Sequence, residues 1–195
     1  MPIIRRTQKP PRQKDYQSYK LYLRLDFGFS CAYCGITELR WGSDRNFVVE
    51  HFRPKAKFPE LIRAYSNLYY ACNRCNEFKG SRWPLAAMIR RGFRFGDPCR
   101  EDIYAAHLRE LPDGSLEPLT RCGEYMIAHV GLNRPMLSEW RQQRRQLLDD
   151  IAAAETAVAL LRRSMRPTLP AKALETLEQL IARHQSLCAR LRSWY

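Results

Sequence analysis

Residues 31–34 are Cys-Ala-Tyr-Cys and residues 72–75 are Cys-Asn-Arg-Cys, so the chain carries two C-x-x-C pairs. Each pair can place two thiolates on one side of a tetrahedral ion, and two pairs together complete a four-cysteine zinc site. A redox function would explain one pair but not a matched second pair. We therefore predict a structural zinc ion with four ligands, namely Cys31, Cys34, Cys72 and Cys75.

An acid–histidine pair lies between the two cysteine pairs, at the end of a predicted strand. Residues 46–49 (Asn-Phe-Val-Val) form the short apolar run that predicts the strand, and Glu50 and His51 follow directly. Phosphodiester hydrolysis needs a base that activates water and a cation that stabilises charge on the phosphate. Imidazole titrates near neutral pH, and carboxylates suit Mg²⁺ or Mn²⁺. The pair therefore predicts a general base, His51, beside a metal ligand, Glu50.

Two asparagines and three cations are spaced so that they can complete this site. Asn67 can hold the imidazole in position, or it can simply begin a helix as its N-cap. Asn76 follows the second cysteine pair and offers an amide oxygen to a divalent ion. The cations of the segment either contact a phosphate or are solvated surface charges; they are Arg53, Lys55 and Lys79.

The whole pattern resembles the zinc-containing HNH endonucleases. It runs C-x-x-C, acid–His, Asn-Leu, C-x-x-C-Asn-x-x-Lys over residues 31–80. Its form at residues 50–55, Glu-His-Phe-Arg-Pro-Lys, is similar to HNH nucleases of retron- and Septu-type anti-phage systems. The resemblance implies these roles: His51 as general base, Asn67 at the middle position, and Glu50 and Asn76 as ligands of a catalytic Mg²⁺ or Mn²⁺. It also implies cleavage of DNA to 3′-hydroxyl and 5′-phosphate ends.

Two positions depart from the commonest HNH pattern. Glu50 stands where Asp is commoner, so a longer side chain carries the carboxylate. Asn76 stands where His is commoner, which removes a nitrogen ligand. Both changes bear on the affinity and identity of the catalytic metal.

The charge of the chain favours a polyanionic partner. Lys and Arg number 33 against 20 Asp and Glu, which gives a net charge of +13. Neutralising a phosphate releases condensed counterions, so such a surplus favours nucleic acid, although it does not choose between DNA, RNA and an anionic membrane. No apolar segment follows Arg5 and Arg6 as a signal peptide would require, and the apolar stretch 151–161 contains Glu155 and is too short to span a bilayer. We expect a cytoplasmic protein without a membrane partner, whose cysteines stay reduced.

Four segments of an α+β chain are expected. They are a basic arm and N-terminal helix (1–27), an HNH nuclease core of ββα-metal type with zinc knuckles (28–95), a mixed α/β connecting segment (96–135) and a C-terminal helical hairpin (136–195). Residues 1–12, rich in Arg, Lys and Pro, are predicted to be a mobile arm. Pro112-Asp113-Gly114 predicts a hairpin turn. Apolar residues at helical spacing predict helices over 136–163 and 171–194, joined by a turn that contains Pro167 and Pro170.

The features combine into a predicted metal-dependent DNA endonuclease, with a role in anti-phage defence implied by the resemblance alone. The alternative is a non-catalytic zinc-ribbon module that binds nucleic acid, which would use the cysteines and the charge but has no need of Glu50-His51. A third function, compatible with the first, assigns the C-terminal helices to docking a regulatory partner such as an ATPase.

Overall fold

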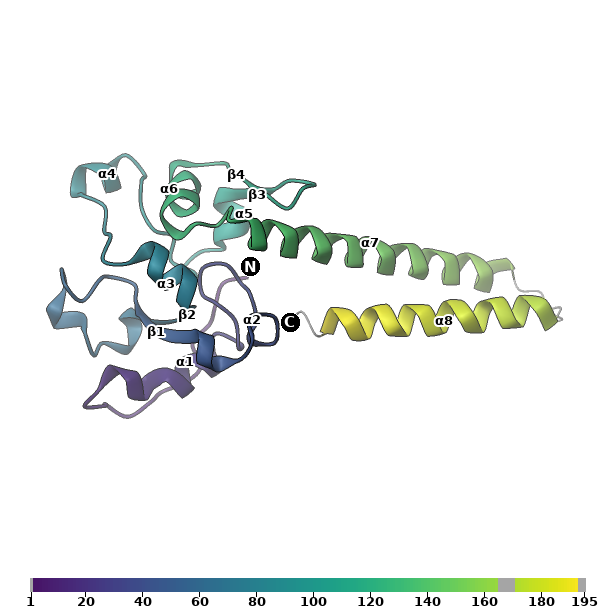
Figure 1. Cartoon of the computed structure of the whole chain (residues 1–195), viewed down its shortest axis with the longest axis horizontal. Helices are drawn as coiled ribbons and strands as arrows, with labels where there is room; N and C mark the ends of the chain where they lie inside the picture. Colours follow the sequence, from purple (N-terminus) through teal and green to yellow (C-terminus); the bar gives the residue numbers. More distant parts are fainter. Residues whose placement is uncertain (1, 165–170, 193–195) are drawn as a thin grey trace. The chain divides into compact units, whose positions relative to one another are not determined.

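The computed structural model describes residues 2–164 and 171–192, and the chain divides into two compact units, Met1–Ser138 and Glu139–Tyr195. Ahead of the connecting segment, the first unit contains η1 (Tyr16–Tyr19), α1 (Lys20–Asp26), α2 (Glu38–Trp41), η2 (Asp44–Asn46), β1 (Phe47–His51), η3 (Pro59–Leu61), η4 (Tyr65–Asn67), β2 (Leu68–Cys72) and α3 (Asn73–Lys79). It continues with α4 (Ala86–Arg90), α5 (Ile103–His107), β3 (Leu108–Glu110), β4 (Leu116–Pro118) and α6 (Arg121–Val130) (Figure 1). Elements labelled η are short 3₁₀ helices.

Strands β1 and β2 and helix α3 form the predicted ββα core. The strands are antiparallel, with Phe47 opposite Cys72 and His51 opposite Leu68. Helix α3 begins directly after β2, and the Cys72 sulfur accepts a hydrogen bond from the backbone N–H of Cys75 at its first turn. The end of β1, the start of β2 and the body of α3 are thereby brought to one place in the fold (Figure 1).

Aromatic residues fill the core around this unit. The ring of Phe47 on β1 stacks on that of Tyr70 on β2, with 4.8 Å between centroids. Tyr69 stacks on Phe52 on the other side of the strand, at 5.0 Å. Both tyrosines are buried, so their rings are part of the core. Aromatic pairs of this kind stabilise by about 0.5–1.5 kcal/mol beyond their buried area.

Two predictions about this unit are wrong. The N-terminal arm is not mobile around residues 6–8, because Arg6 donates to the carbonyls of Tyr65 and Leu68 at 2.6 and 2.7 Å, and the N–H groups of Thr7 and Gln8 bond to the Asp26 carboxylate. The other concerns Asn67, for which a helix N-cap was one expectation. Asn67 ends η4 and precedes strand β2, and the helix begins only after that strand.

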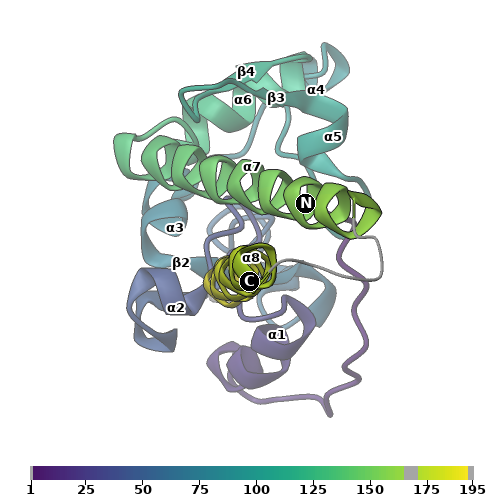
Figure 2. The same cartoon turned by 90° about the vertical axis from the view of Figure 1, so that its right-hand side faces the viewer.

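A second small layer covers the core. Strands β3 and β4 pair antiparallel around the predicted turn at Pro112-Asp113-Gly114, with Arg109 opposite Glu117. Helix α6 lies against them (Figure 2). A Cβ on Gly123 would lie 2.0 Å from the carbonyl oxygen of His107, so only glycine permits this approach. The predicted hairpin turn is therefore confirmed, and the hairpin and α6 belong to the same compact unit as the ββα core.

The C-terminal helices are α7 (Pro135–Ser164) and α8 (Ala171–Arg192). The predicted turn with Pro167 and Pro170 and the predicted end at Trp194 lie outside the described residues. Within the second unit α7 and α8 run antiparallel (Figure 1), and His184 lies 3.3 Å from the carboxylate of Glu155. None of the helices in the described part of the chain is both long enough and apolar enough to cross a membrane.

Candidate active site and cysteine cluster

The four predicted zinc ligands meet in one buried cluster. Their sulfur atoms all lie within 4.8 Å of one another, and Cys34 Sγ is 3.9 Å from Cys72 Sγ. Tetrahedral zinc with Zn–S bonds of about 2.3 Å requires sulfur separations of about 3.8 Å, so the cluster fits this ion. All four thiols are free of disulfides. The two loops that carry them come from the start of the ββα segment and from the β2–α3 junction.

A guanidinium group completes the surroundings of the sulfurs. Arg134, which follows α6, donates to Cys75 Sγ at 3.4 and 3.5 Å and to Cys72 Sγ at 3.7 Å. Burial disfavours its charge, but the nearby sulfurs of Cys75 and Cys34 more than offset this and raise the pKa of Arg134. The permanent positive charge opposes the negative charge that four thiolates carry on a divalent ion. No local pattern marked Arg134 as part of this cluster, since it lies far from the cysteine pairs in sequence.

His51 is held in a defined tautomer by a backbone group. Its Nε2 lies 3.0 Å from the carbonyl oxygen of Ile62, and a carbonyl only accepts hydrogen bonds. Nε2 therefore carries the proton, and Nδ1 keeps the lone pair that a general base needs. Burial lowers the pKa of His51 below its usual 6.5, and the ammonium groups of Lys55 and Lys79 act in the same direction. The imidazole is consequently neutral at pH 7.

Asn67 fixes the loop that carries this carbonyl. Its side-chain oxygen accepts from the backbone N–H of Arg53 at 2.8 Å, and its amide group donates to the Arg53 carbonyl at 3.0 Å. A longer bond, 3.4 Å, reaches the carbonyl of Leu61, next to Ile62. Asn67 thus joins both ends of the loop between β1 and η4, which orients His51 indirectly.

Glu50 takes part in a buried ion pair. Its Oε1 lies 2.5 Å from Lys79 Nζ and accepts from the Tyr33 hydroxyl at 3.2 Å. Burial raises the pKa of Glu50 and lowers the pKa of Lys79, and their mutual attraction limits both shifts. Tyr33, buried beside the carboxylate, has a raised pKa and remains a hydrogen-bond donor. Tyr33 lies inside the first cysteine pair, and nothing in the local sequence indicates that its hydroxyl bonds to Glu50.

Four of the predicted residues line one cavity. A cleft of about 440 Å³, called here the His51 cleft, is bordered by His51, Glu50 and Asn76, and also by Tyr16 and Lys55. Tyr16 lies edge-on to the imidazole, with 4.6 Å between ring centroids. A carboxylate and an amide oxygen are the hard donors that Mg²⁺ or Mn²⁺ prefers, so the donor chemistry of the cleft fits such an ion. Asn67 does not line the cleft.

The three cations predicted to contact a phosphate lie in different environments. Lys79 is fully buried, bonded to Glu50 and, at 2.9 Å, to the carbonyl of His51, so the prediction that it contacts a phosphate is wrong. Its burial follows from its place on α3, whose inner face packs on β1. Lys55 is exposed at the cleft and donates to the Tyr16 hydroxyl at 3.3 Å. Arg53 is exposed and lies over the rings of Phe58 and Trp83, outside the cleft lining.

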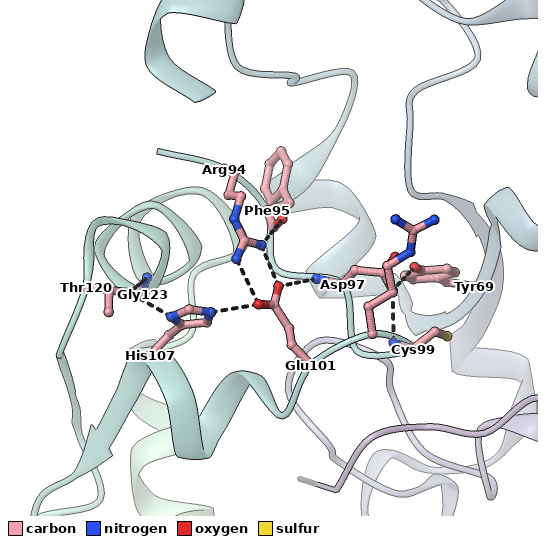
Figure 3. A network of polar contacts seen from close by, with 10 residues as sticks. Tyr69, Arg94, Phe95, Asp97, Cys99, Glu101, His107, Thr120 and Gly123 are labelled. Atoms are coloured by element: carbon pink, nitrogen blue, oxygen red, sulfur yellow. Dashed lines mark hydrogen bonds and ion pairs between the residues drawn. The ribbon is translucent and has the colours of Figure 1, made fainter. Parts of the chain in front are cut away.

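A second cluster of polar side chains, away from the cleft, links residue 94 to the connecting segment (Figure 3). Arg94 forms two bonds to the carboxylate of Glu101, which also bonds to His107 Nε2 at 3.0 Å. The paired guanidinium lowers the pKa of Glu101 to about 2. Cys122 lies close enough for the group to resemble a metal site, but burial raises the pKa of this thiol to about 11. Arg94 already occupies the Glu101 carboxylate, and the Cys122 thiol stays protonated, so this group stabilises the fold and is not a metal site.

Comparison with known proteins assigns the central segment. The family model described as HNH endonuclease matches residues 31–82. The Septu protein PtuB of Bacillus thuringiensis is 40% identical over 52 residues, which are 26% of this chain and 19% of that protein. The match thus spans about a fifth of the relative's length.

The matched segment contains the four clustered cysteines, His51 and Asn76, and it ends before Arg134 and before the Arg94–Glu101–His107 group. The geometry described above, a ββα unit beside a four-cysteine cluster, occupies the same residues. Residues 31–82 of this chain therefore form an HNH endonuclease domain.

Proposed function

We propose that the chain is a metal-dependent endonuclease that hydrolyses DNA phosphodiester bonds with water activated by His51. The observation that carries the proposal is the bond from His51 Nε2 to the Ile62 carbonyl, which leaves Nδ1 as a proton acceptor in a cleft shared with Glu50 and Asn76. A zinc-ribbon binding module has no need of a neutral imidazole fixed in this way.

The residues of the chain have separate tasks in this reaction. His51 Nδ1 takes a proton from water while the water oxygen bonds to phosphorus, and the bond from phosphorus to the 3′ oxygen breaks. The Ile62 carbonyl stabilises the resulting imidazolium through the proton on Nε2. Asn67 is a positioning residue, because it acts through the loop that carries this carbonyl. The released 3′ oxygen takes a proton from solvent.

Two kinds of metal site are part of the proposal. The four cysteines would hold structural zinc, which is supported by their separations and by Arg134. Glu50 and Asn76 would hold Mg²⁺ or Mn²⁺, which supplies positive charge to the phosphate and the leaving oxygen. Lys79 already contacts Glu50 Oε1, so a divalent ion has to share this carboxylate with an ammonium group.

The choice of DNA rests on the resemblance to HNH endonucleases, and the biological role rests on the relative. Similarity to the Septu protein PtuB supports a role in anti-phage defence, with cleavage of nucleic acid as the effector step. A defence nuclease has to be restrained until it is needed, so we further propose that helices α7 and α8 bind a regulatory protein of the same system, such as an ATPase. Loss of complex formation after deletion of these helices would support that assignment.

Cleavage of supercoiled plasmid tests the proposed chemistry. Purified wild type is compared with His51→Ala in Mg²⁺, in Mn²⁺ and without either ion, and a structured RNA is offered in parallel. A matched control is His129→Ala, since His129 is a partly buried histidine of α6 that does not line the cleft. We expect nicking and linearisation of DNA by the wild type and the control in the presence of a divalent ion, and none by His51→Ala.

Retention of full activity by His51→Ala would refute His51 as the base. Metal-dependent cleavage of RNA alone would keep the chemistry and change the substrate. If wild type cleaves nothing yet binds nucleic acid with bound zinc, the zinc-ribbon binding module becomes the better description.

A further inference from the structure

A second cavity adjoins the His51 cleft. It has a volume of about 680 Å³ and is called here the Arg63 pocket. Tyr16 borders both cavities, and Ile62, whose carbonyl holds His51, lines the Arg63 pocket. The pocket therefore begins directly beside the residues that orient the proposed base. It lies between the segment before η1 and the loop around η3.

Unpaired cations surround this pocket. Arg12, Lys14 and Arg63 line it and are exposed, and among residues 2–164 and 171–192 none of the three forms a hydrogen bond or an ion pair. Other arginines in the same unit are already neutralised, such as Arg24 by Glu38 at 2.7 Å. Free cations around a hollow retain their charge for an anionic ligand.

Two carboxylates also line the pocket and have to be weighed against the cations. Asp15 is the N-cap of η1 and accepts from the N–H of Gln17 at 3.2 Å, so part of its charge is used locally. Glu60 is exposed and opposes an anion. Three cations against these two carboxylates leave a positive balance, and the cations come from both walls, Arg12 and Lys14 from one and Arg63 from the other.

We propose that the Arg63 pocket binds the phosphate next to the scissile one in the substrate strand, with Arg12, Lys14 and Arg63 as its contacts. This rests on the proposed function, because it takes the phosphate that reacts to lie in the His51 cleft. A strand that enters that cleft continues beyond it, and the shared border at Tyr16 makes the Arg63 pocket the adjoining basic hollow. The ligand is a phosphodiester of the nucleic acid backbone, so the contacts position the strand without reading its sequence.

Binding measured without cleavage tests the pocket. Full-length His51→Ala protein is titrated into a fluorescent oligonucleotide at several salt concentrations, with and without Arg12→Gln, Lys14→Gln and Arg63→Gln together. The matched control, Arg5→Gln, Lys9→Gln and Arg45→Gln, removes the same charge from exposed residues that line neither cavity. DNA and RNA oligonucleotides of one sequence are both used.

Each phosphate contact contributes about 0.7–0.9 to the slope of log affinity against log salt, so the pocket variant, which loses the contacts to one phosphate, should lose roughly 0.7–0.9 in slope. The control should lose less than half as much, and Glu60→Gln alone should tighten binding. Equal losses in pocket variant and control would overturn the proposal, since net charge alone would then explain them.

A cleavage assay distinguishes failure of the pocket proposal from failure of the proposed function. In protein that keeps His51, the three pocket substitutions together should raise the KM for DNA more than they lower kcat. Normal cleavage with an unchanged KM and slope would reject the pocket and leave the nuclease intact. An altered slope in a chain that cleaves nothing would reject the nuclease and leave a basic strand-binding pocket. A slope change with RNA but not DNA would assign the pocket to RNA.

Discussion

At the scale of single residues, the proposed chemistry depends on groups that orient His51 or neutralise Glu50 without themselves reacting. The Ile62 carbonyl fixes the tautomer of His51, and Asn67 fixes the loop that carries this carbonyl. Lys79 balances Glu50 in a site from which water is largely excluded. Each of these effects can be measured separately, because each predicts a different observable.

Asn67→Ala should lower kcat about 10–100-fold with little change in KM, because a loosened loop misplaces the base without removing it. Asn67→Asp keeps the acceptor for the Arg53 N–H and should lose less. Asn133→Ala is a matched control, since Asn133 bonds the N–H and the carbonyl of Leu116 in the same two-sided way, away from the cleft. A similar fall in kcat for the control would show that Asn67 matters only for folding.

Lys79→Met should destabilise the fold by about 3–5 kcal/mol, because it leaves the Glu50 carboxylate buried without its partner. The double variant Glu50→Gln with Lys79→Met should lose less free energy of unfolding than the two single variants lose in sum. Urea unfolding of the four proteins gives the coupling energy. Strict additivity would mean that the two groups do not interact in solution.

Arg134→Met should weaken zinc binding about 10–100-fold, as is typical when a group that supports metal ligands is removed. Arg134→Lys keeps the charge but loses the two-pronged geometry, so an intermediate effect is expected. Competition with a chromophoric chelator measures the affinity directly. Arg121→Met serves as control, because Arg121 contacts the Arg91 carbonyl and the Phe93 ring instead of sulfur; equal weakening there would contradict a specific role.

At the scale of elements, the segment beyond the HNH match supports the matched part. Helix α6 is followed by Arg134, which reaches the cysteine cluster, and Tyr104 of α5 donates to the carbonyl of Cys34 at 3.2 Å. The Arg94–Glu101–His107 group links the end of the segment 28–95 to the connecting segment, and Thr120, just before α6, bonds His107 Nδ1 at 2.9 Å (Figure 3). These elements belong to the structural support of the cysteine cluster.

The stability contributed by Glu101 should depend on pH. Its pKa of about 2 lies below the usual 4.5, so the folded state favours the ionised form, and the contribution is complete above pH 4.5 and is lost as the pH falls towards 2. Glu101→Gln should therefore be less stable than wild type at pH 7. The difference in free energy of unfolding between the two proteins, called here the gap, should narrow between pH 4.5 and 2. Urea denaturation across this range measures the gap. A gap independent of pH would contradict the assignment.

At the scale of the whole molecule, zinc and the division into two units predict how the chain unfolds. The four cysteines join two loops that are distant in sequence, and all lie in the unit Met1–Ser138. Apolar burial in the second unit does not involve them, since Ile151, Ala154 and Leu187 belong to α7 and α8.

Removal of zinc by a strong chelator should abolish the near-ultraviolet signal of the packed aromatics, including Tyr69 and Tyr70. A large part of the far-ultraviolet helical signal should remain, because α7 and α8 do not depend on the cluster. Addition of zinc should restore the first signal, while an excess of Mg²⁺ should not. Simultaneous loss of both signals would mean that the two units unfold as one.

Much of the metal chemistry was predictable from local sequence. Ligand spacing is a local property, so two C-x-x-C pairs indicated a four-cysteine cluster, and the Glu50-His51 pair at a strand end indicated the cleft. The ββα order was implied by the resemblance to HNH endonucleases, and the hairpin at residues 112–114 was predictable because turn residues act over short distances.

Partners distant in the chain were decided by tertiary structure alone. Lys79 was expected to meet a phosphate, and the packing of α3 on β1 buries it against Glu50 instead. Arg6 was expected in a mobile arm, and three aromatic rings and two carbonyls hold it. The sequence did not predict the contacts of Arg134, Tyr33 and Tyr16. A guanidinium or a phenol has no defined partner until the fold brings it to a sulfur, a carboxylate or an imidazole. The sequence determined which chemistry this protein carries; the fold decided which charges neutralise one another and which remain free for a ligand, because charge pairing depends on distance in space and not along the chain.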